Sequence, residues 1–165
     1  MPEGRDIQVM VVDDTAIYRK IVGGVVQALP GLSLMTTAPD GEIALRKMAQ
    51  RKPDLVLLDV EMPKMDGLAT LRAIKQRYPE VGVVMVSGLN ERAAELTVEA
   101  LNAGALDFIP KPQTRSMEAS RKELGDALQR LIATFRTRLA LRPGGARRPA
   151  RGPARPAPKA RSPRR

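Results

Sequence analysis

The sequence lacks cysteine and histidine altogether, and its 165 residues include only two phenylalanines and two tyrosines. Without cysteine there can be no disulfide and no thiolate metal ligand. Without histidine there can be no imidazole base, no histidine zinc ligand and no Ser-His-Asp triad. Composition alone therefore excludes several classes of enzyme.

Long hydrophobic runs are missing as well. No apolar run reaches the roughly 18 residues that a membrane span needs. The first residues, up to Asp6, are too polar for a secretory signal. We therefore expect a cytoplasmic protein.

The formal charge of +10 is concentrated at the end of the chain. All 18 acidic residues precede Ala127, whereas residues 142–165 contain nine lysines and arginines and no acid. Residues 1–141 then hold 19 basic and 18 acidic side chains, a net charge of +1. The part of the chain that we expect to fold is nearly neutral.

Residues 142–165 are mostly proline, glycine, arginine and alanine, and they show no apolar periodicity. Such a segment cannot bury enough surface to offset its chain entropy, so we predict a disordered tail or linker after a domain that covers residues 1–141. The tail could be a solvated linker, could contact nucleic acid or another anionic surface, or could have no role. Because it has no aromatic residues, any nucleic-acid binding should be independent of sequence and sensitive to salt.

Five short apolar runs alternate with segments that have the spacing of amphipathic helices. The predicted strands are Ile7 to Val12, Leu32 to Ala38, Asp54 to Asp59, Val81 to Ser87 and Leu106 to Ile109. The predicted helices are about Ile17 to Leu29, Asp40 to Lys52, from just after Gly67 to just before Pro79, Glu91 to Ala103 and Met117 to Leu141. Three runs are continuously hydrophobic, which is typical of parallel strands covered on both faces. The pattern predicts an α/β fold: a flavodoxin-like, doubly wound (βα)5 sheet in the order 2-1-3-4-5.

The helical segments carry apolar stripes that we expect to face the core. The first presents Ile17, Ile21, Val25 and Leu29, and the fourth presents Leu96, Val98 and Leu101, the least bulky of these faces. The last presents Leu124, Leu128, Leu131, Ile132, Phe135 and Leu139. At roughly 36 Å, this last helix is longer than short strands need, so its final turns should project beyond the domain.

Carboxylates stand at the ends of two predicted strands. Asp13 and Asp14 follow the first strand, and Asp59 ends the third. In a doubly wound sheet, functional groups gather outside the carboxyl ends of the strands, where the strand order reverses. We therefore expect these three acids to converge with Ser87 and Lys111 from the tips of the fourth and fifth strands.

Three neighbouring carboxylates repel one another unless a cation joins them, and Mg²⁺ suits such a site because it takes oxygen ligands and shares its shell with phosphoryl groups. Asp59 could then attack phosphorus and form an aspartyl phosphate. Mg²⁺ and Lys111 would neutralise the phosphoryl oxygens, and Ser87 would donate a hydrogen bond. Mg²⁺ is the only cofactor that we predict.

Together with the loop Met62 to Gly67 and the segment Gly104 to Pro112, these residues resemble the receiver domain of bacterial two-component response regulators. The resemblance covers about Ile7 to Leu139. It implies that Asp59 is the phosphoacceptor for a histidine kinase.

The same resemblance implies a ligand set for Mg²⁺. Asp14, Asp59 and the backbone carbonyl of Glu61 would bind the ion directly, and Asp13 would act mainly through a bound water. It also implies a switch in which the Ser87 hydroxyl moves toward the phosphoryl group and Phe108 rotates inward. The output face would be the fourth helix, fifth strand and fifth helix, and Lys111-Pro112 would often be a cis peptide.

A closer resemblance lies in Met85 to Thr97 and Glu99 to Leu101, which are similar to chemotaxis methylesterase response regulators. It implies a chemotaxis-type kinase and an appended methylesterase domain. That catalytic domain is missing here: the chain has no Gly-x-Ser-x-Gly motif and no histidine, so we expect no enzyme activity beyond self-dephosphorylation. The basic tail stands where an interdomain linker would begin. Its low-complexity end at Arg165 favours a fragment of a methylesterase over a stand-alone receiver.

Simpler interpretations compete at several residues. Asp14 or Asp66 could merely cap a helix, and for Asp66 we favour capping. Phe108 could be a core residue instead of a switch. A phosphohydrolase could use the same acids, but the chain offers no second domain to enclose a substrate. A nucleic-acid-binding regulator would need the tail, because no helix-turn-helix follows residue 141.

Overall fold

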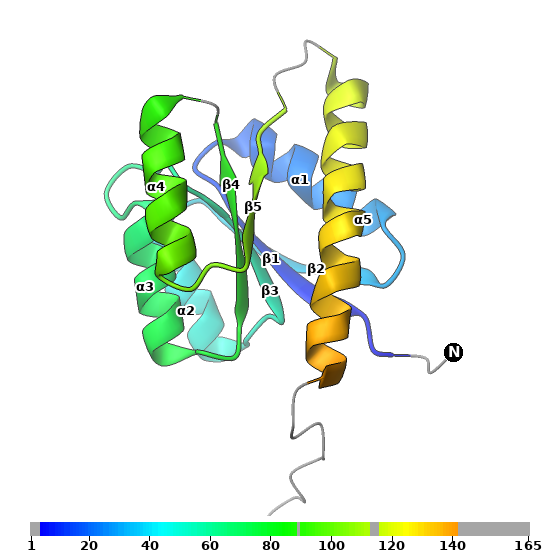
Figure 1. Ribbon diagram of the computed structural model, residues 1–165, viewed down its shortest axis with the longest axis horizontal. Helices are drawn as coiled ribbons and strands as arrows, with labels where there is room; N and C mark the ends of the chain where they lie inside the picture. Colours follow the sequence, from blue (N-terminus) through cyan, green and yellow to red (C-terminus); the bar gives the residue numbers. More distant parts are fainter. Residues whose placement is uncertain (1–3, 89, 113–115, 142–165) are drawn as a thin grey trace, which may run out of the picture.

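The structure is a computed structural model that describes residues 4–88, 90–112 and 116–141, and it contains a five-stranded parallel sheet between two layers of helices (Figure 1). The strands are β1 (Ile7–Val12), β2 (Leu32–Ala38), β3 (Leu55–Asp59), β4 (Gly82–Ser87) and β5 (Asp107–Pro110). The helices are α1 (Ala16–Ala28), α2 (Gly41–Gln50), α3 (Gly67–Arg77), α4 (Glu91–Asn102) and α5 (Met117–Leu141). The ends of all ten elements lie within two residues of the predicted positions.

The strand order is β2-β1-β3-β4-β5, and every neighbouring pair is parallel. The predicted doubly wound, flavodoxin-like fold is therefore confirmed. Strand order reverses between β1 and β3, where Val12 pairs with Leu58. The residues that follow this pair, Asp13 and Asp59, consequently leave the sheet side by side.

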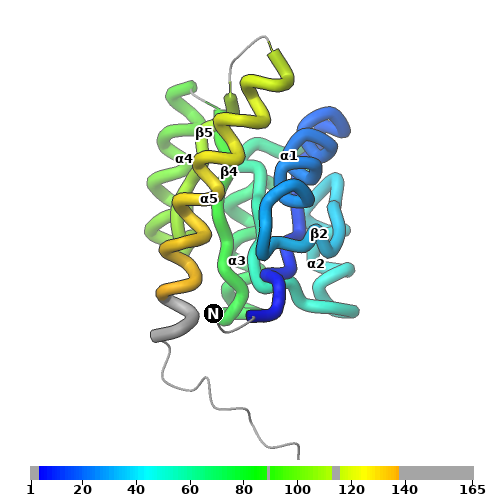
Figure 2. Tube along the Cα trace, turned by 90° about the vertical axis from the view of Figure 1, so that its right-hand side faces the viewer, coloured from blue at the N-terminus to red at the C-terminus, as the bar shows by residue number. Residues whose placement is uncertain are grey.

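Helices α1 and α5 cover one face of the sheet, and α2, α3 and α4 cover the other (Figures 1 and 2). Alternate strand residues point to opposite faces, so Val9 and Val11 join the core under α1 and α5, whereas Met10 and Val12 join the core under the other three helices. All five residues of β3 are buried. This double burial explains why the central strands are continuously hydrophobic.

Side-chain caps fix where three of the helices begin. Asp40 accepts a hydrogen bond from the Ile43 N–H at the start of α2, and Asn90 accepts one from Ala93 at the start of α4. Asp66 accepts one from the Ala69 N–H at 2.8 Å, which confirms its predicted capping role. Asp14 does not cap α1, because the N-cap position belongs to Thr15.

Two predicted apolar faces were partly wrong. Ile17 near the start of α1 is 65% exposed, because it lies next to the strand tips, beyond the edge of the core. On α4, Val98 is 59% and Leu101 is 38% exposed. This helix contacts the sheet through smaller side chains instead, with Ala93, Thr97 and Ala100 buried and Leu96 packed at the edge of the core.

The long helix α5 was predicted more accurately. Leu124, Leu128, Ile132 and Phe135 are buried and Leu131 is partly buried against the same core. The Arg136 guanidinium donates to the Gly31 carbonyl at 3.2 Å, so the helix still contacts the domain close to its end at Leu141. That the final turns after Arg136 project beyond the domain stays a prediction, because the side chains of residues 138–141 are not described. Leu139, whose side chain is not described, and the predicted tail at 142–165 are not tested by the structure.

Within the described part of the chain, no helix is both long enough and apolar enough to cross a membrane. 

Candidate functional site

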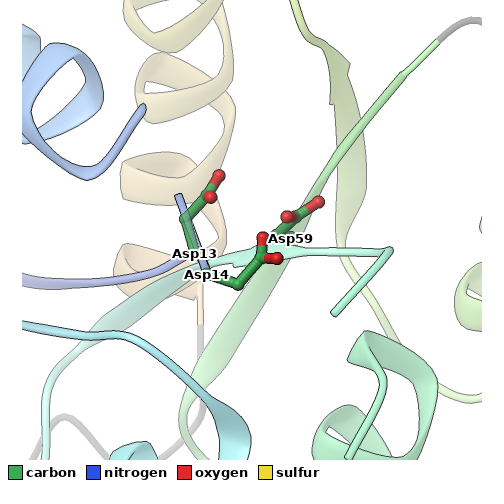
Figure 3. Close-up of side chains that lie close together, drawn as sticks. All are labelled: Asp13, Asp14 and Asp59. Atoms are coloured by element: carbon green, nitrogen blue, oxygen red, sulfur yellow. The ribbon is translucent and has the colours of Figure 1, made fainter. Parts of the chain in front are cut away.

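Three carboxylates meet at the point where the strand order reverses. Asp13 and Asp14 follow β1, and Asp59 is the last residue of β3. Each offers an oxygen atom within 4.8 Å of the others, and Figure 3 shows the three side chains gathered at the strand tips. The predicted convergence of these acids is therefore present.

Lys111 completes this cluster from the tip of β5. Its Nζ lies 3.1 Å from Asp13 Oδ2 and 3.1 Å from Asp59 Oδ2, so one ammonium bridges two carboxylates. Both acids are buried, at 2% and 3% exposure, whereas Asp14 is exposed at the mouth of the site. The lysine is held on its other side by the ring of Tyr18 on α1, whose centroid lies 4.4 Å from Nζ.

Backbone amides orient the two buried acids. The Thr15 N–H donates to Asp13 Oδ1 at 2.8 Å, and the Glu61 N–H donates to Asp59 Oδ1 at 3.3 Å. The loop that contains Glu61 is held in place by tight backbone packing: a methyl group on Gly67 would overlap the Asp59 carbonyl oxygen. Lys64 in this loop adopts a left-handed conformation with φ of 68°, which is uncommon for a residue with a side chain.

The electrostatics of the site disfavour a charged Asp59. The pKa of Asp59 is raised from 3.8 to about 7, chiefly by burial and then by the neighbouring Asp13 carboxylate, while Lys111 and the Glu61 N–H act in the opposite direction. Burial alone would lower the pKa of Lys111, but the charges of Asp13 and Asp59 outweigh it and raise that pKa. The positive charge of one lysine is thus too small to keep Asp59 fully ionised beside Asp13.

A divalent cation fits this arrangement. Three carboxylate oxygens converge within 4.8 Å, which is the hard oxygen donor set that Mg²⁺ prefers. Two of the acids share a single ammonium, so an added cation would favour the charged form of Asp59. Asp13, Asp14 and Asp59 are the side chains that would hold it. The role of the Glu61 backbone carbonyl as a further ligand stays a prediction.

Ser87 ends β4 and is buried, as expected for a residue at the edge of the site. Its hydroxyl lies 3.3 Å from the hydroxyl of Thr97 on α4. Phe108 on β5 is 43% exposed, so the interpretation of this residue as part of the core was wrong. The Lys111-Pro112 peptide is trans, because every peptide bond in the described residues is trans, so the implied cis bond is not found.

Sequence reasoning missed several residues beside the site, among them Tyr18 and Thr97. Tyr18 belongs to a chain with only four Phe and Tyr residues, and it lies one helical turn after Asp14. That position could have drawn attention to it. Thr97 gave no such signal, because a threonine within a helical pattern has no specific meaning until its neighbours are known.

A five-stranded, doubly wound sheet with clustered acids at the tips of β1 and β3 and a lysine at the tip of β5 defines a class of signalling domains. The sequence profile of the response regulator receiver domain matches residues 9–120 of the chain. The chain belongs to the response regulator receiver domain family, as its resemblance predicted.

Within that family, the chain is similar to chemotaxis methylesterase response regulators. It is 40% identical to the protein-glutamate methylesterase/protein-glutamine glutaminase of Desulfotalea psychrophila over 134 residues, which are 81% of this chain and 37% of that protein. It is 46% identical to the protein of the same name from Pyrococcus horikoshii over 125 residues, 76% of this chain and 33% of that protein. The chain thus spans about a third of the length of these relatives. The matches cover their receiver part alone, so they show no enzyme domain here.

Solved structures agree with this assignment. The response regulator domain of Thermotoga maritima CheB is 34% identical, with a TM-score of 0.67, and the match covers 84% of this chain and 100% of that one. CheY in a CheX-CheY-BeF3-Mg²⁺ complex from Borrelia burgdorferi matches with 31% identity and a TM-score of 0.63, over 80% of this chain and 91% of the matched one. The predicted resemblance to methylesterase receivers is confirmed.

Proposed function

We propose that Asp59 accepts a phosphoryl group from a histidine kinase in a Mg²⁺-dependent reaction, and that the phosphorylated domain regulates a chemotaxis methylesterase. The observation that carries this proposal is the setting of Asp59: a buried carboxylate at a strand tip, between two further acids and a lysine that lies 3.1 Å away. The sequence similarity to protein-glutamate methylesterases supports the chemotaxis assignment.

The reaction requires Asp59 as a charged carboxylate. With a pKa of about 7, Asp59 would be partly protonated near neutral pH, and a protonated carboxyl is a poor nucleophile. Bound Mg²⁺ would supply positive charge for the phosphoryl oxygens. Asp13 and Asp14 lie close enough to hold such an ion, and the bound ion would favour the deprotonated form of Asp59 against the repulsion from Asp13.

In the transfer step, an Asp59 carboxylate oxygen forms a bond to phosphorus as the bond from phosphorus to the donor nitrogen breaks. The electron pair of the broken bond leaves with that nitrogen of the kinase phosphohistidine. Lys111 is already beside Asp59 Oδ2, so its ammonium can shift to an incoming phosphoryl oxygen by a small movement. Hydrolysis of the acyl phosphate by water later returns inorganic phosphate and the free carboxylate.

We place the output surface on α4, β5 and α5. Val98, Leu101 and Phe108 are exposed hydrophobic side chains on the first two of these elements. A groove between β5 and α5 is lined by Phe108, Pro110, Arg130 and Leu131 among others. An apolar surface of this kind suits contact with an appended domain or a partner protein. Ser87 and Phe108 are the residues that would transmit the change to it.

We further propose that residues 1–141 form the regulatory domain and that residues 142–165 are a linker to a methylesterase domain in the full-length protein. Because this chain has no histidine, its own residues cannot build the esterase centre. Limited proteolysis tests the boundary. Cleavage confined to the region after residue 141 is expected, and early cuts within residues 7–137 would contradict it.

The first test is intact mass after incubation with phosphoramidate and Mg²⁺, for the wild type, Asp59→Asn and the control Asp54→Asn. Asp54 precedes the opposite end of β3, where it pairs with Arg5, so its replacement leaves the site intact. We expect a labile gain of one phosphoryl group in the wild type and the control and none in Asp59→Asn. Phosphorylation that persists in Asp59→Asn would refute the assignment.

The second test concerns the kinase. A chemotaxis-type histidine kinase is expected to transfer its phosphoryl group to Asp59 at least about tenfold faster than a kinase from an unrelated two-component pathway, because specific contacts worth about 1.4 kcal/mol give that factor. Equal rates would remove the support for the chemotaxis assignment without affecting the phosphoacceptor role.

A further inference from the structure

The buried hydroxyl of Thr97 links the tip of β4 to helix α4. Thr97 is 5% exposed and Ser87 is 4% exposed, so water has little access to either hydroxyl. The two oxygen atoms lie 3.3 Å apart, and Thr97 Oγ1 also lies 2.7 Å from the Ala93 carbonyl oxygen. The pair is therefore a small buried polar network between a strand and a helix.

The protons of this network can be assigned. A hydroxyl has one proton to donate and two lone pairs, whereas a carbonyl oxygen only accepts. In the short contact, the Thr97 hydroxyl donates its proton to the Ala93 carbonyl oxygen. The 3.3 Å contact then requires Ser87 to donate and Thr97 to accept. The only proton of Ser87 is thus committed to Thr97.

The geometry of β4 explains why Ser87 meets α4. Side chains alternate along a strand, and Met85 belongs to the core on the α4 side, whereas Val86 belongs to the core under α1 and α5. Ser87 has the same parity as Met85. Its backbone carbonyl meanwhile accepts from the Lys111 N–H at 2.7 Å, which keeps this strand tip beside the acidic cluster.

We propose that Thr97 is a positioning residue that holds the Ser87 hydroxyl on α4 until Asp59 is phosphorylated. This inference rests on the proposed function. A phosphoryl oxygen can receive the Ser87 proton only after the contact to Thr97 is broken. Thr97 thereby opposes phosphorylation in the resting domain. By the reciprocity of coupled equilibria, phosphorylation in turn releases α4 from the tip of β4.

Helix α4 is suited to such a release. Its buried side chains are Ala93, Thr97 and Ala100, so a single polar contact is a larger part of its attachment than it would be for a helix with bulky core residues. Two of its apolar residues, Val98 and Leu101, already face solvent and belong to the proposed output surface. The Thr97 contact would therefore join the chemistry at Asp59 to the helix that carries this surface.

The test measures the dissociation constant of beryllofluoride, an analogue of the phosphoryl group, in the presence of Mg²⁺ by isothermal titration calorimetry with the 165-residue chain. The variant Thr97→Val removes the hydroxyl and keeps the shape of the side chain, while Thr97→Ser retains a hydroxyl. We expect Thr97→Val to bind about two- to tenfold more tightly than the wild type, because the hydrogen bond that opposes binding is gone. Thr97→Ser should bind like the wild type.

A double-mutant cycle isolates the pair. In a Ser87→Ala background, Thr97→Val should change the affinity little, because the hydroxyl that Thr97 holds is absent. Thr97→Ala serves as a second variant if thermal unfolding shows that Thr97→Val is not folded. Such a gain in affinity is not expected from a change that only weakens packing.

The outcomes separate the two hypotheses. If the wild type binds beryllofluoride but Thr97→Val binds equally or less well, or if its gain persists in the Ser87→Ala background, the role of Thr97 is overturned and the phosphoacceptor site stands. If neither the wild type nor Thr97→Val binds, the proposed function itself fails, and the role of Thr97 fails with it.

Discussion

Helices α1 and α4 cover opposite faces of the same sheet, yet different kinds of side chain hold them there. Helix α1 buries Ile21, Val22, Val25 and Val26 along with Gly23, whereas α4 buries Ala93, Thr97 and Ala100. Each helix also sends side chains toward the strand tips. Tyr18 from α1 covers Lys111, and Thr97 from α4 contacts Ser87.

The difference shows how one domain can combine a rigid site with a movable surface. Buried Ile and Val side chains each contribute about 1.5–3 kcal/mol, so α1 is anchored strongly. Small side chains bury less apolar area, so α4 should open at lower free energy than α1. The layer of α1 and α5 would then fix Lys111, while α4 responds to events at Asp59.

The largest expected effect compares a leucine from each layer. Leu128 on α5 is 1% exposed, whereas Leu96 on α4 is only partly buried. Leu128→Ala should lower the free energy of unfolding by about 2–5 kcal/mol, because it leaves a cavity in the core. Leu96→Ala should cost about 1 kcal/mol, because solvent already reaches that side chain. Urea unfolding measures both, and equal losses would contradict the difference between the layers.

Two glycines give a second contrast. A methyl group on Gly67 would overlap the Asp59 carbonyl and lie 2.7 Å from Val60 Cα, whereas one on Gly24 of α1 would meet nothing within 4 Å. Gly67→Ala should cost about 1–3 kcal/mol by overpacking and should slow phosphorylation by displacing Asp59. Gly24→Ala should stabilise the protein by about 0.5–1 kcal/mol, through helix propensity alone. If Gly24→Ala lowered the free energy of unfolding, it would contradict the open space beside Gly24 on α1.

The third comparison concerns the acidic cluster at the strand tips, which lies between the two layers of helices. It is tested by the pH dependence of the free energy of unfolding. The pKa of Asp59 is raised to about 7 in the folded protein, so the folded state binds this proton more tightly than the unfolded chain. Stability from this group is therefore present near pH 4 and is lost as the pH rises toward 7. The raised pKa of Lys111 contributes stability that is present below its ordinary pKa of 10.5 and is lost only as the pH rises beyond that value.

Asp59→Asn removes this pH dependence. In EDTA at pH 8, the variant should be more stable than the wild type by about 1–2 kcal/mol, and near pH 4 the two should be similar. Urea unfolding at both pH values provides the measurement. Mg²⁺ should reduce the difference at pH 8, because a cation would favour charged Asp59. An equal difference at both pH values would contradict the raised pKa.

The smallest expected effect concerns Tyr18, which belongs to the firmly anchored helix. Tyr18→Leu should slow phosphorylation by phosphoramidate about two- to fivefold, because Lys111 loses the ring that holds it over the acids. Tyr18→Phe keeps the ring and should behave like the wild type. If both variants were equally slow, the phenol hydroxyl would matter more than the contact between ring and ammonium.

Much of the fold could be predicted because its information is local. Pro30 and Gly31 end the first helix, Asp66 caps the third, and the continuous run up to Asp59 marks a strand buried on both faces. The acids at strand tips followed from this topology, since parallel strands bring their carboxyl ends to one edge of the sheet. Lys111 joined them by the same argument.

Contacts that depend on how elements turn against each other could not be predicted. The spacing of Val98 and Leu101 suggested a core face of α4, but the helix packs through Ala93, Thr97 and Ala100. Ile17 is exposed near the start of α1, and Phe108 is exposed on the edge strand β5, where its neighbour Ile109 is the buried residue.

By itself, the sequence determined the alternation of strands and helices, the strand order and the cluster of carboxylates at the reversal of that order. The alternation follows from hydrophobic periodicity and turn residues, which act over short stretches of chain, and the right-handedness of parallel connections restricts the strand orders that are possible. Only the tertiary structure decided that Lys111 bridges Asp13 and Asp59, that Tyr18 covers it, and that Ser87 meets Thr97. Those contacts depend on the rotation and depth of helices packed on the sheet, which the summed packing of many side chains sets and no single segment contains.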